Sequence, residues 1–83
     1  MKLGKLKKRV KKLIKKHRKG VRIKEKKITK ILRELEAKED KYKQALDAEE
    51  SQKTQQNLKL KLAVTRAQIQ KARKLLSELD SES

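Results

Sequence analysis

The chain lacks the residues on which several classes of protein depend. None of its 83 residues is Cys, Pro, Trp or Phe, and His17 is the single histidine. Without cysteine there is no disulfide framework, zinc ribbon or redox motif, and one histidine leaves too few soft ligands for a transition metal. The longest apolar run is three residues, 62–64, so no segment is predicted to span a membrane.

Residues that could carry catalysis are also scarce. His17 falls in an apolar stripe, with no nucleophile or orienting acid predicted within reach. The acid pairs at 39–40 and 49–50 are adjacent in sequence, so on a helix their side chains point about 100° apart and do not flank one bond. There is no glycine-rich phosphate loop. We therefore expect a non-enzymatic protein that uses no cofactor and no metal.

The composition favours helices over a globular core. Apolar residues make up 34% of the chain, aromatic residues 1% and charged residues 46%. Low hydrophobicity with high net charge is typical of disorder. However, the commonest residues are strong helix formers, and glycine occurs only at positions 4 and 20. This combination predicts an all-α rod held together by narrow apolar seams.

Charge divides the chain into two segments. Residues 1–33 contain 17 Lys and Arg residues and one acid, whereas residues 34–83 contain ten basic and ten acidic residues. The whole net charge of +16 therefore lies in the first 33 residues. Such a block pattern is typical of a basic interaction segment joined to a neutral assembly segment.

Apolar periodicity predicts where the helices lie. Leu3, Leu6, Val10, Leu13 and His17 follow a three-four spacing, which predicts a basic amphipathic helix over residues 1–20 that ends at a glycine. Two further stripes predict an antiparallel helical hairpin, or coiled-coil rod, over residues 21–80, with a frayed tail at 81–83. The predicted seam and oligomerisation positions are Ile28, Leu32, Leu35, Tyr42, Leu46, Leu58, Leu62, Ile69, Ala72, Leu76 and Leu79.

The position of the turn is open between three alternatives. In an antiparallel pair of helices, the residue numbers of two facing residues add up to a constant. The stripe over 28–46 and the stripe over 58–79 satisfy this rule if the turn lies near 51–57. That segment is polar and contains three weak helix formers. A second register pairs the stripe of the basic helix with the stripe over 58–79, and it places the turn near 38–41. A third possibility is one unbroken helix over residues 22–80 in an intermolecular coiled coil, since no Pro or Gly interrupts it.

The last stripe also has apolar neighbours on a second side. Leu60, Ala63, Val64 and Ala67 lie beside the seam. A helix with one partner needs only one stripe, so two apolar sides predict two neighbours. The second neighbour is either the basic helix or another subunit, and we expect a homo-oligomer, a dimer or higher.

The basic segment is the strongest functional signal. Eleven cations and no acid within residues 1–20 repel one another, a cost that favours a polyanionic partner. Lysine predominates and aromatic residues are absent there, which indicates contacts with a nucleic-acid backbone rather than base reading or stacking. The predicted contacts are Lys5, Lys7, Lys8, Arg9, Lys11, Lys12, Lys15, Lys16, Arg18, Lys19, Arg22, Lys24, Lys26 and Lys27.

We therefore expect sequence-nonspecific binding of DNA or structured RNA. Two alternatives remain: a structural adaptor that docks on an acidic protein surface, and a peripheral binder of anionic membranes. No secretory signal peptide is visible, so we expect an intracellular protein, in the cytoplasm, nucleoid or nucleus.

Overall fold

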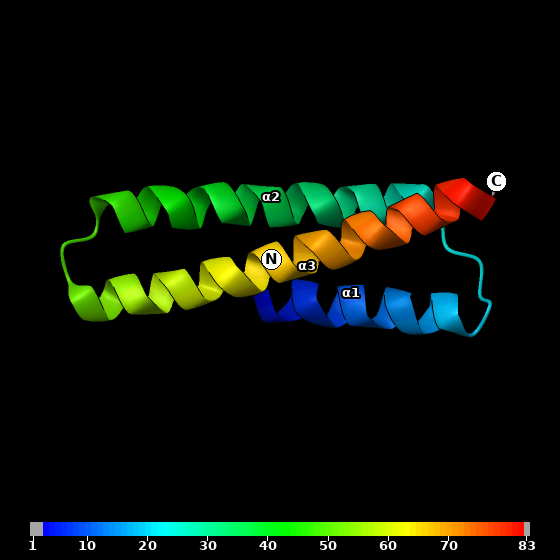
Figure 1. The fold of residues 1–83 in the computed structure, drawn as a ribbon, viewed down its shortest axis with the longest axis horizontal. Coiled ribbons are helices and arrows are strands. Elements are labelled where there is room, and N and C mark those ends of the chain that lie inside the picture. The colour runs from blue at the N-terminus through cyan, green and yellow to red at the C-terminus, as the bar shows by residue number, and fades with distance from the viewer. Residues whose placement is uncertain (1–2, 83) are drawn as a thin grey trace.

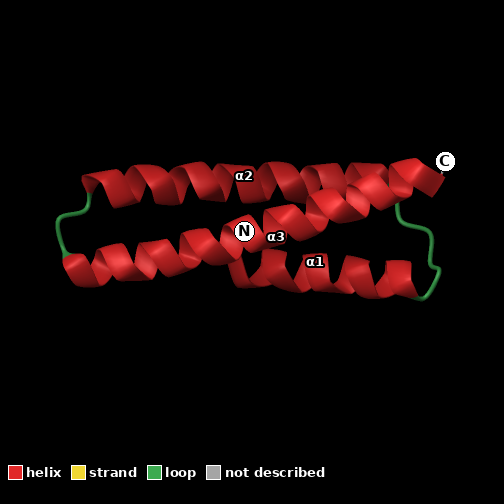
Figure 2. Cartoon of the chain, in the orientation of Figure 1, coloured by secondary structure: helices red, strands yellow, loops and turns green. Residues whose placement is uncertain are grey.

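Three helices account for the fold. The computed structural model describes residues 3–82, and the side chains of residues 3–79. Helix α1 spans Leu3–Arg18, α2 spans Glu25–Ala48 and α3 spans Gln52–Glu82 (Figures 1 and 2). The all-α prediction is confirmed, and most of the packing is between α2 and α3, which run antiparallel as a hairpin. Residues 1 and 2 of the predicted basic helix lie outside the described residues.

A glycine motif ends α1. Gly20 has a φ of 79°, in the left-handed region that favours glycine. Its N–H donates to the His17 carbonyl at 3.0 Å, and the Val21 N–H donates to the Lys16 carbonyl at 2.9 Å. These two bonds form a Schellman motif, which satisfies carbonyl groups that the end of the helix leaves without partners. The chain therefore leaves α1 at a defined angle and turns into α2.

The turn of the hairpin lies earlier than the sequence predicted. Residues 49–51 connect α2 to α3. Residues 52–57 already belong to α3, and α2 runs without a break through 38–41. The loop overlaps the turn predicted near 51–57 at Ser51 and extends toward α2 instead of toward α3. The two alternatives, a turn near 38–41 and an unbroken helix over 22–80, are not found in the described chain. The Gln55 side-chain amide donates to the Glu49 carbonyl at 2.6 Å, and the Gln55 N–H donates to the Ser51 carbonyl at 2.9 Å. Polar residues of the expected loop thus stabilise the start of α3.

Helix α3 extends into the segment predicted to fray. The helix is continuous to Glu82, and fraying over 81–83 stays a prediction; residue 83 lies outside the described residues. Leu75 is buried, and Leu76 and Leu79 pack against the core from partly buried positions. This packing holds the last turns of α3, because tertiary contacts contribute more to helix stability than local propensity does.

Helix α1 covers only one half of the hairpin. The molecule measures 47 × 18 × 17 Å, and a 16-residue helix is about 24 Å long. Figure 1 shows α1 beside the end of the rod where α2 begins and α3 ends. We call residues 3–36 and 66–79 the three-helix half, and residues 37–65 the two-helix half.

The buried core follows this division. The main apolar cluster lies in the three-helix half and consists of Leu6, Val10, Ile23, Ile28, Ile31, Leu32, Leu35, Ile69, Ala72 and Leu75. In the two-helix half the buried side chains are those of Leu62 and Thr65. Tyr42, Leu46 and Leu58 are only half-buried there. The third helix therefore decides how completely the hairpin seam is covered.

Candidate nucleic-acid interface

The apolar stripe of α1 determines which of its side chains face outward. Leu6 and Val10 are buried, and Leu3, Leu13 and Ile14 pack against the core from partly buried positions. Because these positions share one face of the helix, the lysines between them lie on its remaining surface. The stripe thus anchors α1 while its cations stay in solvent.

Nearly all the predicted contact residues are exposed. Arg9 is half-buried, and the other thirteen are exposed: Lys5, Lys7, Lys8, Lys11, Lys12, Lys15, Lys16, Arg18, Lys19, Arg22, Lys24, Lys26 and Lys27. Those of α1 line its outer surface. Arg22, Lys24 and Lys26, with His17 and Leu79, line a hollow of about 790 Å³. This hollow lies at the end of the rod opposite the hairpin turn (Figure 1).

A groove between α1 and α3 gathers cations from both helices. It has a volume of about 690 Å³, and Lys7, Lys11, Lys15 and Arg18 of α1 line it together with Lys71 and Lys74 of α3. Sequence reasoning placed only the four residues of α1 in a binding site. Lys71 and Lys74 lie in a segment with balanced charge, so only the packing of α1 on α3 reveals that they join the same surface.

One acid in this groove is already engaged. Glu78 lines the groove, and its Oε2 atom lies 3.1 Å from His17 Nε2. His17 thus serves as a contact between α1 and α3. The six Lys and Arg residues of the groove take no part in the ion pairs found within residues 3–79.

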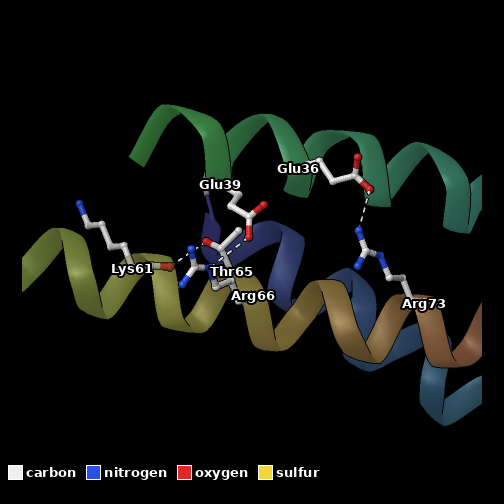
Figure 3. A network of polar contacts seen from close by, with 6 residues as sticks. All are labelled: Glu36, Glu39, Lys61, Thr65, Arg66 and Arg73. Atoms are coloured by element: carbon white, nitrogen blue, oxygen red, sulfur yellow. Dashed lines mark hydrogen bonds and ion pairs between the residues drawn. The ribbon is translucent and has the colours of Figure 1, made fainter. Parts of the chain in front are cut away.

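Arginines account for the other ion pairs between helices in the described part of the chain. Arg9 of α1 lies 3.8 Å from Glu34 of α2, a distance too long for a hydrogen bond. The buried Oε2 atom of Glu34 has no hydrogen-bond partner. Between α2 and α3, Arg66 Nε donates to Glu39 Oε2 at 3.2 Å, and Arg73 lies 3.6 Å from Glu36 (Figure 3).

The exposed lysines leave the two halves with very different charge. Residues 3–36 and 66–79 contain 20 basic residues and four acidic ones, whereas residues 37–65 contain six basic and five acidic residues. The three-helix half therefore carries the cationic field of the molecule, and the two-helix half is nearly neutral. A surface with this much charge of one sign attracts polyanions over a distance of about 8–10 Å at physiological salt.

The predicted seam residues separate by position along the rod. Ile28, Leu32, Leu35, Leu62, Ile69 and Ala72 are buried, whereas Tyr42, Leu46, Leu58, Leu76 and Leu79 are half-buried. The prediction omitted Leu6, Val10, Ile23, Ile31 and Leu75 from the seam, although all five are buried. The apolar stripe of α1 was the available signal for Leu6 and Val10.

Comparison with protein-family models, with curated proteins and with solved structures finds no match to this chain. Within the described residues, no helix combines the length and the apolar character needed to cross a membrane. The same residues contain no cluster of three or more His, Cys, Asp or Glu side chains placed to hold a metal ion.

Proposed function

We propose that this protein binds the sugar-phosphate backbone of DNA or structured RNA, without sequence preference, through its three-helix half. The single observation that carries the proposal is the groove between α1 and α3, where Lys7, Lys11, Lys15, Arg18, Lys71 and Lys74 converge outside the ion pairs of the described chain. Two elements far apart in sequence supply these cations, so the tertiary fold concentrates them on one surface.

The spacing of the groove cations suits an extended polyanion. Lys7, Lys11 and Lys15 are four residues apart, so they form a row on α1 with a rise of about 6 Å per step. Duplex DNA carries one negative charge per about 1.7 Å of its axis, and releasing its condensed counterions drives binding. The row of lysines on α1, together with Lys71 and Lys74 on α3, can neutralise several phosphates at once.

The residue types argue against base recognition. Lysine is a compact, strongly hydrated point charge that suits phosphates, whereas Arg, Asn and Gln present planar paired groups with the fixed geometry that favours base reading. The groove contains one arginine and one glutamine, Gln68, which is buried. We therefore expect affinity to depend on salt far more than on nucleotide sequence.

The position of Leu6 and Val10 disfavours the membrane alternative. An interfacial helix inserts its apolar stripe among lipids, and here that stripe is part of the protein core. Membrane insertion would require α1 to leave the core cluster that it shares with α2 and α3. An acidic protein partner would use the same cationic surface, and the experiment below separates it from nucleic acid.

The proposed function also includes self-association through a coiled coil. In the two-helix half the predicted seam residues Tyr42, Leu46 and Leu58 are only half-buried, and Leu60 is 66% exposed. A second subunit that packs here would cover Leu60 together with these half-buried seam residues. The nearly neutral charge of this half makes it the part of the molecule that two copies can share.

A pair of charge-matched variants tests the binding surface. Replacing Lys11, Lys15, Lys71 and Lys74 with Gln removes four cations from the groove. The control replaces Lys41, Lys43, Lys53 and Lys59, all exposed in the two-helix half, and changes the net charge equally. Each variant is titrated with duplex DNA, duplex RNA, anionic vesicles and an acidic polypeptide over a series of salt concentrations.

We expect the groove variant to bind both nucleic acids more weakly. The slope of its log K against log salt should be flatter by about 0.9 for each phosphate that the variant no longer neutralises. The control should resemble the wild-type chain. Equal weakening in both variants would show that net charge, and not the groove, decides affinity. Tighter binding to vesicles or to the polypeptide than to nucleic acid would contradict the proposed ligand.

A further inference from the structure

The surface of α2 and α3 on which α1 packs continues beyond the start of that helix. Helix α1 contacts both α2 and α3 and begins at Leu3, while 52–63 of α3 extend past it toward the hairpin turn. Leu60 precedes Glu78 by 18 residues, about five helical turns, so it lies on the side of α3 that meets His17. The surface that contacts α1 is therefore prolonged into the two-helix half.

Apolar side chains line this continuation from both helices. On α3, Val64 precedes the core residue Leu75 by 11 residues, about three turns, and is half-buried. On α2, Tyr42 follows the core residue Ile31 by the same interval and is also half-buried. We call the surface formed by Tyr42, Leu60 and Val64 the open slot. Leu60 is its most exposed member, at 66%.

The distribution of charge indicates what covers the open slot. Two three-helix halves repel each other, because each contains 20 basic and four acidic residues. Two-helix halves, with six basic and five acidic residues each, approach without this penalty. A second copy of the chain can therefore cover the slot only if its three-helix half points away.

The hairpin turn supplies complementary charge for that arrangement. Asp47, Glu49 and Glu50 lie at or beside the turn. When two copies of the chain lie antiparallel, these acidic residues approach the start of α1 in the other copy. The first turn of that helix includes Lys5 and has no acidic residue. The start of a helix also carries the positive end of its dipole, so acidic groups are favourable there.

We propose that the open slot is covered by the same slot of a second copy, in an antiparallel dimer with two-fold symmetry. The two-helix halves then form a four-helix bundle, and the cationic halves project from opposite ends of a longer rod. This locates the self-association included in the proposed function, and it stands independently of nucleic-acid binding. A dimer of this shape presents two cationic grooves and bridges two nucleic-acid segments.

Sedimentation velocity on the full chain tests the interface. Leu60→Gln removes an exposed apolar side chain from the slot, and Val21→Gln removes one from the α1–α2 loop, where Val21 is 48% exposed. Both are measured in about 0.5 M salt, where repulsion between the cationic halves is screened. We expect the wild-type chain and Val21→Gln to dimerise equally, and Leu60→Gln to dimerise at least about tenfold more weakly.

Because the chain has no cysteine, single cysteines provide a second measurement. Residues near a two-fold axis contact their own counterparts, so Leu60→Cys should form a disulfide-linked dimer at least about tenfold faster than Val21→Cys. A wild-type monomer at about 100 μM would overturn the proposal, as would equal behaviour of the two positions in either experiment. Binding to duplex DNA by monomeric Leu60→Gln would leave the proposed nucleic-acid binding standing, so the binding surface and the dimer interface can fail separately.

Discussion

The three-helix half and the two-helix half share one hairpin but bury it differently. In the first half, Leu6 and Val10 of α1 complete a core in which Leu35 and Ile28 are almost fully buried. In the second half, Leu46 and the other predicted seam residues near the turn remain half-buried. The same apolar spacing therefore gives a closed core only where a third helix covers it.

The two halves also differ in how much charge they carry. The three-helix half carries nearly all the net charge, and the two-helix half is nearly neutral. Apolar burial by α1 offsets the mutual repulsion of its lysines, because its buried stripe faces inward and its cations face solvent. The buried stripe of α1 and its exposed lysines thus lie on opposite faces of the same helix.

The largest expected effect comes from truncating the seam at one position in each half. Leu35→Ala should lower the free energy of unfolding by about 2–5 kcal/mol, because Leu35 is 0% exposed and its truncation leaves a cavity. Leu46→Ala, at a half-buried position, should cost about 1 kcal/mol. Urea unfolding followed by circular dichroism measures both values. Equal destabilisation would show that α1 does not close the core.

The two glycines of the three-helix half should respond with opposite signs. Gly20→Ala forces a side chain into a backbone with a φ of 79°, which costs about 1–2 kcal/mol even though no atom lies within 4 Å of the added group. Gly4→Ala replaces an exposed helical glycine and should stabilise the chain by up to about 1 kcal/mol. Thermal melting distinguishes them. A stabilising Gly20→Ala would contradict the Schellman end of α1.

Salt should stabilise one half more than the other. Raising the salt concentration from about 0.05 M to 0.5 M screens repulsion among the lysines of the three-helix half, a gain on the order of 1 kcal/mol. Hydrogen exchange should show slower exchange for amides of α1 and little change for amides near residues 44–56. Uniform slowing along the rod would mean that the charge difference does not govern local stability.

The smallest effect is expected at the border of the two halves. Glu39 and Arg66 form an ion pair there, with side chains that are 23% and 53% exposed (Figure 3). Ion pairs near the surface contribute little, so Glu39→Gln should cost less than about 1 kcal/mol. A double-mutant cycle with Arg66→Gln isolates the coupling between them. A coupling above about 2 kcal/mol would show that this pair, rather than apolar burial, joins the halves.

The sequence predicted the helices better than it predicted their surroundings. The stripe from Ile28 to Leu35 and the stripe from Ile69 to Ala72 were placed in the seam, and these residues are buried. Tyr42, Leu46 and Leu58 have equivalent spacing but are half-buried, since no third helix reaches them. Periodicity shows which side of a helix is apolar, but the number of neighbours depends on tertiary packing.

The turn position shows a similar limit. The matching of two apolar stripes and the weak helix formers within 51–57 together predicted a turn there. In the folded chain the Gln55 side chain bonds to the Glu49 carbonyl, and the same residues begin α3. A contact between residues six positions apart therefore outweighed their individual preferences.

Three features could be predicted from the residues alone: the all-helical character, the apolar stripe of α1 and the concentration of cations in residues 1–33. These follow from local chemistry: strong helix formers, three-four spacing and the composition of one segment. Two other features are visible only in the folded chain: α1 covers one half of the hairpin, and Lys71 and Lys74 join the lysines of α1 (Figure 1). Both depend on the burial of Leu6 and Val10 against residues distant in the chain, through contacts that no local pattern encodes.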